Sequence, residues 1–339
     1  MGSIAVGGGA EVSIQSMLNA PPHDAEANVQ QAMRLESIGC QIIRAAVPDR
    51  ESVDIIYRLK EKTNMPVVAD IHFDYRLALE AVEAGADKIR INPGNIGSRD
   101  KVEKVASACA KKRLPIRIGV NAGSLEKHLL KKYGAPCVDA LVDSTLYNIS
   151  LLEELEFYDI IVSIKSSDVP TMFEAYKRLS EKCDYPLHLG VTEAGTKHMG
   201  VIKSAAGIGG LLLSGIGDTI RVSLTDDPAE EVYAARDILK AIGRRKGGPM
   251  LISCPTCGRT RIDLISLAKE VERRLEGCTK DITVAVMGCE VNGPGEASHA
   301  DIGIAGGKDC GVIIRKGEIL RRVPQSRLVD ELMAEIDKL

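Results

Sequence analysis

Short apolar runs rich in β-branched residues alternate with amphipathic stretches through the first two thirds of the chain. Eight runs have the length and composition of buried strands: Val12–Met17, Gln41–Val47, Pro66–Ile71, Lys88–Asn92, Ile116–Asn121, Ile160–Lys165, Leu187–Thr192 and Thr219–Leu224. Apolar residues recur at helical spacing in the segments between them: Asp24–Ile38, Glu51–Thr63, Tyr75–Ala84, Asp100–Lys112, Cys137–Leu155, Val169–Cys183 and Lys197–Ala206. A last helix, Ala229–Ile242, is predicted behind Asp226-Asp227-Pro228, which is a capping signal.

This alternation of eight strands with helices indicates an α/β fold, a (β/α)8 TIM barrel over residues 1–243. An open, doubly wound sheet is the alternative, but no G-x-G-x-x-G pattern follows the first predicted strand. Gly207-Ile-Gly-Gly210 comes late and follows a predicted helix, so we interpret it as a tight loop rather than a nucleotide-binding turn.

A charged, Gly/Pro-rich linker, 243–249, separates the barrel from a smaller α/β domain predicted over residues 244–339. Its predicted strands are Met250–Ile252, Ile282–Met287, Ile302–Ala305, Gly311–Arg315 and Ile319–Arg322, and its predicted helices are Arg261–Leu275 and Ser326–Lys338. Two cysteine-containing loops follow the first two of these strands. We therefore expect both loops to project from the same end of one small sheet.

The composition of the chain limits the kinds of partner and the cellular compartment that we expect. With 45% apolar but only 3% aromatic residues, the core must be aliphatic, and a net charge of -3 favours neither nucleic acid nor a membrane surface. No apolar run is long enough to span a bilayer, and the first residues lack the pattern of a signal peptide, so we expect a cytoplasmic protein. The nine cysteines, odd in number and irregularly spaced, are then expected to be reduced thiols.

Three cysteines lie where a soft metal could be held. Cys254-Pro-Thr-Cys257 has C-x-x-C spacing, and Cys289 lies in a second Gly/Pro-rich loop. Structural zinc normally takes four Cys or His ligands, and the only nearby histidine is His299, so an incomplete thiolate set favours an iron–sulfur cluster. A zinc site and a dithiol redox pair stay open as alternatives.

The carboxyl ends of the predicted barrel strands are unusually polar for an interior that is normally filled with Val, Ile and Leu. The candidate ligand-binding side chains are Arg44, His72, Arg90, Asn92, Arg117, Asn121, Lys165, His188 and Arg221, with Lys88 and Asp70 nearby and Glu193 just beyond the seventh strand. Some of these cations could instead form structural salt bridges with carboxylates such as Asp70 or Glu193. Because the cations outnumber the carboxylates, we expect a polyphosphorylated small molecule at the barrel mouth.

Long motifs in both predicted domains resemble the 4-hydroxy-3-methylbut-2-enyl diphosphate synthase family. They are Val68-Ala-Asp-Ile-His-Phe-Asp74, Lys88-Ile-Arg-Ile-Asn-Pro-Gly-Asn-Ile-Gly97, Ile118-Gly-Val-Asn-Ala-Gly-Ser124, Leu187-His-Leu-Gly-Val-Thr-Glu-Ala-Gly195, Gly215-Ile-Gly-Asp-Thr-Ile-Arg-Val-Ser223, Ser253-Cys-Pro-Thr-Cys-Gly-Arg259 and Met287-Gly-Cys-Glu-Val-Asn-Gly-Pro-Gly-Glu296. The resemblance covers nearly the whole chain. It implies an iron–sulfur oxidoreductase that opens the ring of 2-C-methyl-D-erythritol 2,4-cyclodiphosphate, with two electrons and loss of water, in non-mevalonate isoprenoid biosynthesis.

The resemblance also implies a cofactor, ligands and partners. A [4Fe–4S] cluster would be bound by Cys254, Cys257, Cys289 and the carboxylate of Glu296. The substrate's diphosphate would lie on the barrel cations, flavodoxin or ferredoxin would supply electrons, and a homodimer would bring the cluster of one subunit to the barrel of the other. We expect Glu193 to donate a proton. The alternative function is a zinc-stabilised barrel lyase or phosphate-binding module without a redox role.

Overall fold

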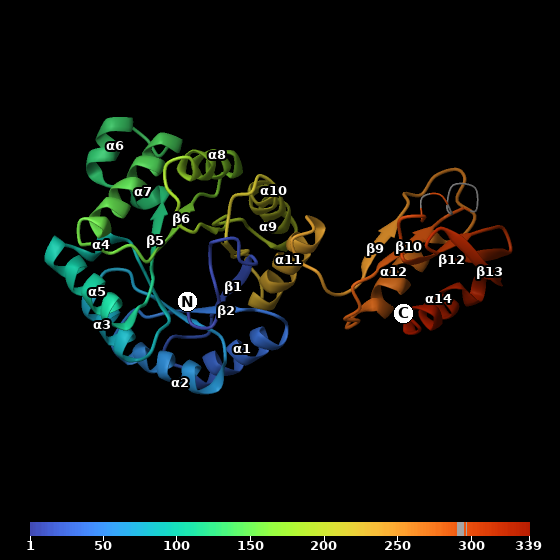
Figure 1. The fold of residues 1–339 in the computed structure, drawn as a ribbon, viewed down its shortest axis with the longest axis horizontal. Helices are drawn as coiled ribbons and strands as arrows, with labels where there is room; N and C mark the ends of the chain where they lie inside the picture. The colour runs from blue at the N-terminus through green and yellow to red at the C-terminus, as the bar shows by residue number, and fades with distance from the viewer. Residues whose placement is uncertain (290–294, 296) are drawn as a thin grey trace. The chain divides into compact units, whose positions relative to one another are not determined.

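The computed structural model describes residues 1–289, 295 and 297–339, and Figure 1 shows the chain as a ribbon. The chain divides into two compact units, Met1–Arg245 and Lys246–Leu339. Among the described helices, none combines the length and apolarity needed to cross a bilayer.

The first unit is the predicted barrel, with eight parallel strands in the order β6-β5-β4-β3-β2-β1-β8-β7. The strands are β1 (Ser13–Met17), β2 (Ile42–Ala46), β3 (Val67–Asp70), β4 (Lys88–Ile91), β5 (Ile116–Asn121), β6 (Ile160–Lys165), β7 (His188–Leu189) and β8 (Thr219–Ile220). All eight lie within the predicted runs. The last two are shorter than expected, because the chain after β7 turns to the loop after β6, where Thr192 N donates to Ser166 O at 3.2 Å, instead of extending its ladder with β8.

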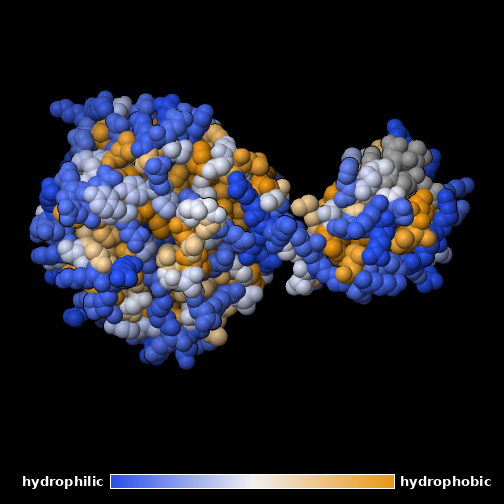
Figure 2. Space-filling model, viewed as in Figure 1, coloured by the Kyte–Doolittle hydropathy of each residue, from blue (hydrophilic) through white to orange (hydrophobic). Residues whose placement is uncertain are grey.

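Helices ring the strands, as the apolar spacing predicted (Figure 1). They are α1 (Ala25–Ser37), α2 (Asp54–Lys62), α3 (Tyr75–Glu83), α4 (Pro93–Ile96), α5 (Arg99–Lys112), α6 (Lys127–Tyr133), α7 (Val138–Glu153), α8 (Val169–Ser180), α9 (Lys197–Ser204), α10 (Gly210–Leu213) and α11 (Pro228–Ala241). The short helices α4, α6 and α10 were not predicted. On the side seen in Figure 2, hydrophilic side chains predominate at the outer rim of this unit, since the helices turn their apolar faces to the strands.

Aspartates cap several of these helices, as Asp227 illustrates. Its side chain accepts a hydrogen bond from Ala229 N at 2.9 Å, and Pro228 occupies the first turn of α11. Asp24, Asp74 and Asp168 cap α1, α3 and α8 in the same way. A capped helix start fixes the point at which each strand–helix loop ends.

The tight loop expected at Gly207-Ile-Gly-Gly210 is wrong, because this segment is helical. A π-helical turn, Ala205–Gly209, joins α9 to α10. A Cβ atom at Gly207 would lie 2.8 Å from Met172 Cε of α8. Glycine is therefore used here for close helix packing and not for a turn.

The second unit is a small α/β fold whose five-stranded sheet has the order β13-β12-β11-β10-β9. Its elements are β9 (Met250–Ser253), α12 (Leu264–Leu275), β10 (Thr283–Met287), β11 (Ile302–Gly306), β12 (Cys310–Arg315), β13 (Glu318–Pro324) and α14 (Leu328–Asp337). Strands β9, β10 and β11 are parallel, and β12 and β13 continue antiparallel. The helices α12 and α14 pack together over an aliphatic core that includes Val284, Ile304 and Leu332.

Candidate functional site

Charged side chains stand at alternate positions of the inner barrel strands, as the period of a strand requires. The register aligns Asp70 of β3 with Arg90 of β4, and Arg90 with Arg117 of β5. Six cations contribute to this interior, and we call them the barrel cations: Arg44, Lys88, Arg90, Arg117, Lys165 and Arg221.

Asp70 is the carboxylate that pairs with two of the barrel cations. Its oxygens lie 2.6 Å from an Arg44 nitrogen, 3.1 Å from an Arg90 nitrogen and 3.4 Å from His72 Nε2. Burial alone would raise the pKa of Asp70, but the Arg44 charge, the His72 hydrogen bond and the Arg90 charge hold that pKa well below its usual value. The structural salt bridges left open by the sequence therefore exist for Arg44 and Arg90.

A second carboxylate, Glu231 of α11, pairs with Arg221. The Arg221 guanidinium donates to both Glu231 oxygens, at 3.2 and 3.3 Å, and Leu224 N donates to one of them at 3.0 Å. Glu193, which could have paired with one of the cations, pairs with neither Arg221 nor Lys197, since Lys197 pairs with Glu230 at 2.6 Å. No sequence signal marked a carboxylate in the first turn of a helix as the buried partner.

Lys88 and Arg117 have no carboxylate partner among the described residues. Both side chains are fully buried, and neither the Lys88 ammonium nor any of the three Arg117 nitrogens has a hydrogen-bond partner in the described part of the chain. Burial, and then the charges of neighbouring arginines, lower the pKa of both groups well below their usual values. Burying unpaired cations is costly, so the interior is prepared for an anion.

His188 lies among these cations. Its ring is buried, and Nδ1 has no partner among the described residues. Burial, with Arg117 and Lys88 next in importance, lowers the pKa of His188 well below its usual value. The ring is therefore neutral at neutral pH and can offer one N–H to a bound anion.

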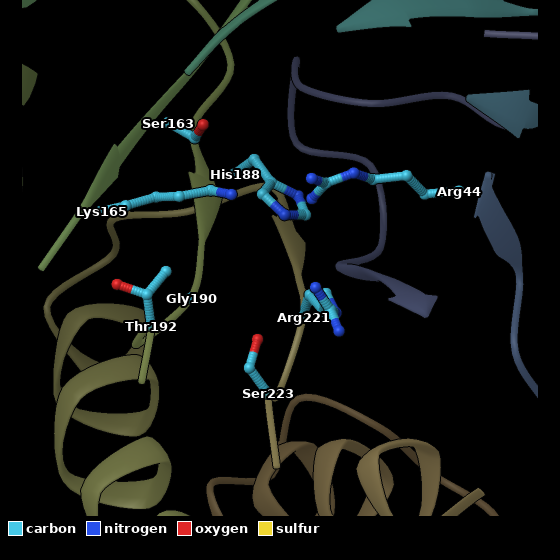
Figure 3. A pocket seen from close by; sticks show the side chains of 8 residues that line it. All are labelled: Arg44, Ser163, Lys165, His188, Gly190, Thr192, Arg221 and Ser223. Carbon is cyan, nitrogen blue, oxygen red and sulfur yellow. The ribbon is translucent and has the colours of Figure 1, made fainter. Parts of the chain in front are cut away.

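A pocket is lined by side chains from β2, β6, β7 and the segment after β8, and Figure 3 shows its lining. Arg44, Lys165 and Arg221 point toward His188 from three different places in the barrel, and the empty space among the lining residues is about 260 Å³ including its open side. The remaining lining residues are Ser163, Gly190, Thr192 and Ser223. None of these four was predicted as a site residue. Three of them lie two residues from Lys165, His188 or Arg221, and Thr192 lies two residues beyond Gly190, so strand periodicity could have found them.

The other predicted residues lie at the strand ends. Asn121 ends β5 and aligns with Lys165, which places it next to the pocket lining. His72 is exposed and contacts Asp70. Asn92 instead caps α4, where its side-chain oxygen accepts from Gly94 N at 3.1 Å.

Glu193 follows the pocket residue Thr192 and is exposed. No described residue forms an ion pair or hydrogen bond with its side chain. Its φ is 52°, a left-handed conformation that non-glycine residues seldom adopt and that is concentrated at functional sites. The carboxylate is thus available at the rim of the barrel.

In the second unit, the C-x-x-C loop and the Cys289 loop leave the sheet at the same end, as expected. Cys254 directly follows β9, Cys289 lies just beyond β10, and these neighbouring strands run parallel. Cys254 Sγ accepts a hydrogen bond from Gly288 N at 3.2 Å, so the two loops are joined at the sulfur. Glu296, the expected fourth ligand, lies outside the described residues.

The chemistry of this donor set fits a thiolate-bound cluster. Cys257 is exposed, and its pKa is lowered by backbone hydrogen bonds from Arg259 and by the Thr260 side chain. N–H···S bonds of this kind stabilise thiolates and adjust the reduction potential of iron–sulfur centres. No three metal-ligating side chains within 1–289, 295 and 297–339 are gathered closely enough to hold a metal ion by themselves.

Comparison with models of protein families identifies the family of both units. A model described as the GcpE TIM-barrel domain matches residues 1–236, and one described as the GcpE protein C-terminal domain matches residues 250–338. The chain belongs to the GcpE family. The TIM barrel followed by a small second domain is the architecture that these GcpE matches describe, and the predicted fold is confirmed.

Curated GcpE relatives cover the whole chain. A Clostridium perfringens (strain 13 / Type A) protein named 4-hydroxy-3-methylbut-2-en-1-yl diphosphate synthase (flavodoxin) is 60% identical over 100% of this chain and 97% of its own length. A Shouchella clausii protein of the same name is 57% identical over 100% of this chain and 92% of its own length. The family predicted from the motifs is therefore confirmed.

Solved structures resemble the barrel of this GcpE chain in fold alone. Dihydropteroate synthase from Clostridium difficile aligns with a TM-score of 0.52 at 19% identity, over 71% of this chain and 100% of that one. Dihydropteroate synthase from Stenotrophomonas maltophilia aligns with a TM-score of 0.50 at 17% identity, over 69% of this chain and 93% of that one. These similarities support the barrel and carry no argument about its ligand.

Proposed function

We propose that the chain is a 4-hydroxy-3-methylbut-2-en-1-yl diphosphate synthase. It converts 2-C-methyl-D-erythritol 2,4-cyclodiphosphate to the open-chain diphosphate, takes up two electrons and releases one water. Flavodoxin, which the names of the relatives specify, is the electron donor. One structural observation carries the substrate class: fully buried Arg117 and Lys88 lack any anionic partner in the described residues, so the barrel requires a polyanion.

The substrate's diphosphate binds among the barrel cations. Arginine forks match phosphate oxygens two at a time, and Arg117 has every N–H free to do so. Lys165 and Arg221 add charge from the pocket wall, and neutral His188 donates one hydrogen bond. Asp70 and Glu231 hold Arg44, Arg90 and Arg221 in place before the substrate arrives.

Glu193 is the proposed proton donor for the departing oxygen. Its carboxyl group is exposed beside Thr192 and is unpaired among the described residues, so it can exchange protons with solvent before the substrate closes the site. Glu193→Gln keeps the shape and removes the proton. We expect turnover to fall at least about a hundredfold, the usual contribution of general acid catalysis, with little change in substrate affinity.

A [4Fe–4S] cluster held by Cys254, Cys257, Cys289 and Glu296 completes the proposed enzyme. Such a cluster, held by these four side chains, would supply one-electron transfer between the donor and the substrate. A carboxylate is a harder and weaker ligand for iron than a thiolate, so Glu296 is the exchangeable position. Mössbauer spectra of wild type and Glu296→Ala test this ligand, because identical iron environments in both would remove Glu296 from the set.

The homodimer is also a proposal, in which the second unit of one subunit serves the barrel of the other. A mixed dimer with Arg117→Ala in one chain and Cys289→Ala in the other should retain one working site, because one barrel and one cluster stay intact together. Full turnover by a monomer would contradict this assembly.

The reaction is tested by anaerobic turnover of the cyclodiphosphate with dithionite and a mediator dye. Reconstituted protein that is brown, holds about four irons and forms the open-chain diphosphate supports the proposal. Colourless protein with stoichiometric zinc and no turnover would instead support the zinc-stabilised lyase or binding module.

A further inference from the structure

The junction between β6 and β7 differs from the other strand junctions of the barrel. The strand order begins at β6 and ends at β7, and the structure records only an isolated bridge between Val162 and Leu187 across this β6–β7 seam. At the base of the seam Val162 N donates to Pro186 O at 2.9 Å. In a regular parallel ladder the next hydrogen bond donated by β6 would join Ile164 N–H directly to His188 C=O.

The hydroxyl of Tyr176 takes the place of that hydrogen bond. Tyr176 reaches the seam from α8 with no exposed surface, accepts a hydrogen bond from Ile164 N at 2.9 Å and donates one to His188 O at 2.5 Å. A phenol can do both at once, since it is donor and acceptor. Burial raises the pKa of Tyr176, so the hydroxyl keeps the proton that the His188 carbonyl needs.

The seam forms one wall of the pocket described above. Ser163 and Lys165 line the pocket from β6, while His188 and Gly190 line it from β7 and the residue that follows (Figure 3). A hydroxyl inserted between a donor and its acceptor keeps the two strands farther apart than a direct hydrogen bond would. The width of the pocket between Lys165 and His188 therefore depends on this group.

The geometry points to Tyr176 as a positioning residue that sets the spacing of Lys165 and His188 for binding the substrate's diphosphate. That the ligand is the substrate's diphosphate rests on the proposed function, whereas the two hydrogen bonds of Tyr176 between β6 and β7 do not. Tyr176 itself does not line the pocket. It acts through the backbone of the two strands that carry the binding side chains.

Tyr176→Phe separates this role from simple core packing, because it keeps the ring and removes the hydroxyl. Ile164 N–H and His188 C=O must then either close up directly or stay unpaired in the interior. The first result moves Lys165 relative to His188, and the second leaves their spacing without the hydrogen bonds that hold it. Tyr185→Phe is the matched control, since the Tyr185 hydroxyl donates to Glu153 at 2.8 Å in an exposed hydrogen bond and does not bridge β6 and β7.

The experiment measures binding of inorganic diphosphate by calorimetry and hydrogen exchange of the Ile164 amide in the full-length chain. Tyr176→Phe should weaken diphosphate binding about tenfold, which is about 1.4 kcal/mol, and should accelerate exchange at Ile164. In the turnover assay KM should rise by about the same factor while kcat stays within about twofold. Tyr185→Phe should match wild type in all three measurements.

Each possible result tests a separate part of the proposal. Unchanged exchange at Ile164 in Tyr176→Phe would overturn the two hydrogen bonds of Tyr176 between β6 and β7. Faster exchange with unchanged diphosphate affinity would overturn the positioning role and leave Tyr176 a structural residue. A wild-type protein that binds diphosphate but has no turnover would refute the proposed reaction and leave the Tyr176 test standing.

Discussion

The barrel carries its candidate ligands on strands, whereas the second unit carries them in loops that follow strands. Arg90 and Arg117 are buried at fixed register positions of β4 and β5, so their place is set by the sheet itself. Cys257 is exposed in a loop, and Cys289 lies beyond the end of β10. A site on strands is assembled before its ligand binds, and the free-energy cost is that of burying unpaired charges. A thiol site in loops takes its final arrangement only when the metal centre binds.

Removing a cysteine should therefore abolish the reaction without disturbing the barrel. Cys289→Ala is expected to lower iron content and eliminate turnover, because the cluster loses one of three thiolates. Affinity for inorganic diphosphate should stay at the wild-type value, since that site belongs to the first unit. Iron analysis, visible absorbance and calorimetry check the three statements.

Cys278→Ala is the matched control, because Cys278 lies in the same unit just after α12 but outside the proposed ligand set. It should keep iron, colour and turnover. Loss of diphosphate binding in Cys289→Ala would contradict the separation of the two sites.

The largest expected effect on stability concerns Asp70, which pairs with Arg44 and Arg90 in the barrel. Asp70→Asn leaves both guanidinium groups without their anion, and breaking a buried pair in this way costs about 3–5 kcal/mol of unfolding free energy. Denaturant titration at pH 7 measures the loss. Glu174→Gln removes an exposed partner of Arg178 in α8 and should cost no more than about 0.5 kcal/mol.

The pH dependence of the Asp70 effect has a definite sign. The folded pKa lies well below the usual 3.8, so the ionised carboxylate contributes its full stability above about pH 4 and loses it as pH falls through the folded value. The difference between wild type and Asp70→Asn should thus shrink only in strong acid. A difference that disappears already between pH 7 and pH 5 would contradict the ion-pair explanation.

Arg117 should show the opposite balance of stability and binding. Arg117→Met removes an unpaired buried cation, so the unfolding free energy should stay the same or rise, while diphosphate affinity falls by about 2–5 kcal/mol. Arg90→Met should lower both quantities, because it also takes a partner from Asp70. A collapse of stability in Arg117→Met with unchanged affinity would show that Arg117 is a structural residue.

The sequence could predict which strands carry polar side chains, because strand membership and residue type are local properties. Arg44, Lys165 and His188 were predicted as site residues because they are polar residues of predicted barrel strands, and the structure gathers them in one pocket. The pairing of Arg221 with Glu231 was missed, since it joins a strand to a helix turn and depends on how α11 packs.

Packing between elements also explains the other failures. Gly207 contributed to a turn signal, but it permits close contact between helices, which no local pattern reveals. The hydroxyl of Tyr176 lies on the buried face of α8, where a sequence predicts only an apolar contact. The candidate thiol ligands were predicted from the spacing and surroundings of the cysteines, whereas their arrangement depends on loops.

The smallest expected effect is a pH dependence that arises from His188 in the barrel. Burial and the charges of Arg117 and Lys88 lower its folded pKa well below the usual 6.5. Between the folded value and 6.5 the unfolded chain binds the extra proton, so stability should fall as pH decreases below about 6.5, by up to about 1.4 kcal/mol per pH unit. Thermal unfolding from pH 7.5 to 5.5 without ligand measures this slope.

His188→Gln should flatten the slope, whereas His198→Gln, at an exposed position of α9, should leave it unchanged. Inorganic diphosphate should also reduce the slope in wild type, because an anion among the barrel cations offsets the repulsion that keeps His188 neutral. A slope that persists in His188→Gln would assign the titration to another group. A slope unaffected by diphosphate would mean that the anion binds too far from His188 for the pocket described here.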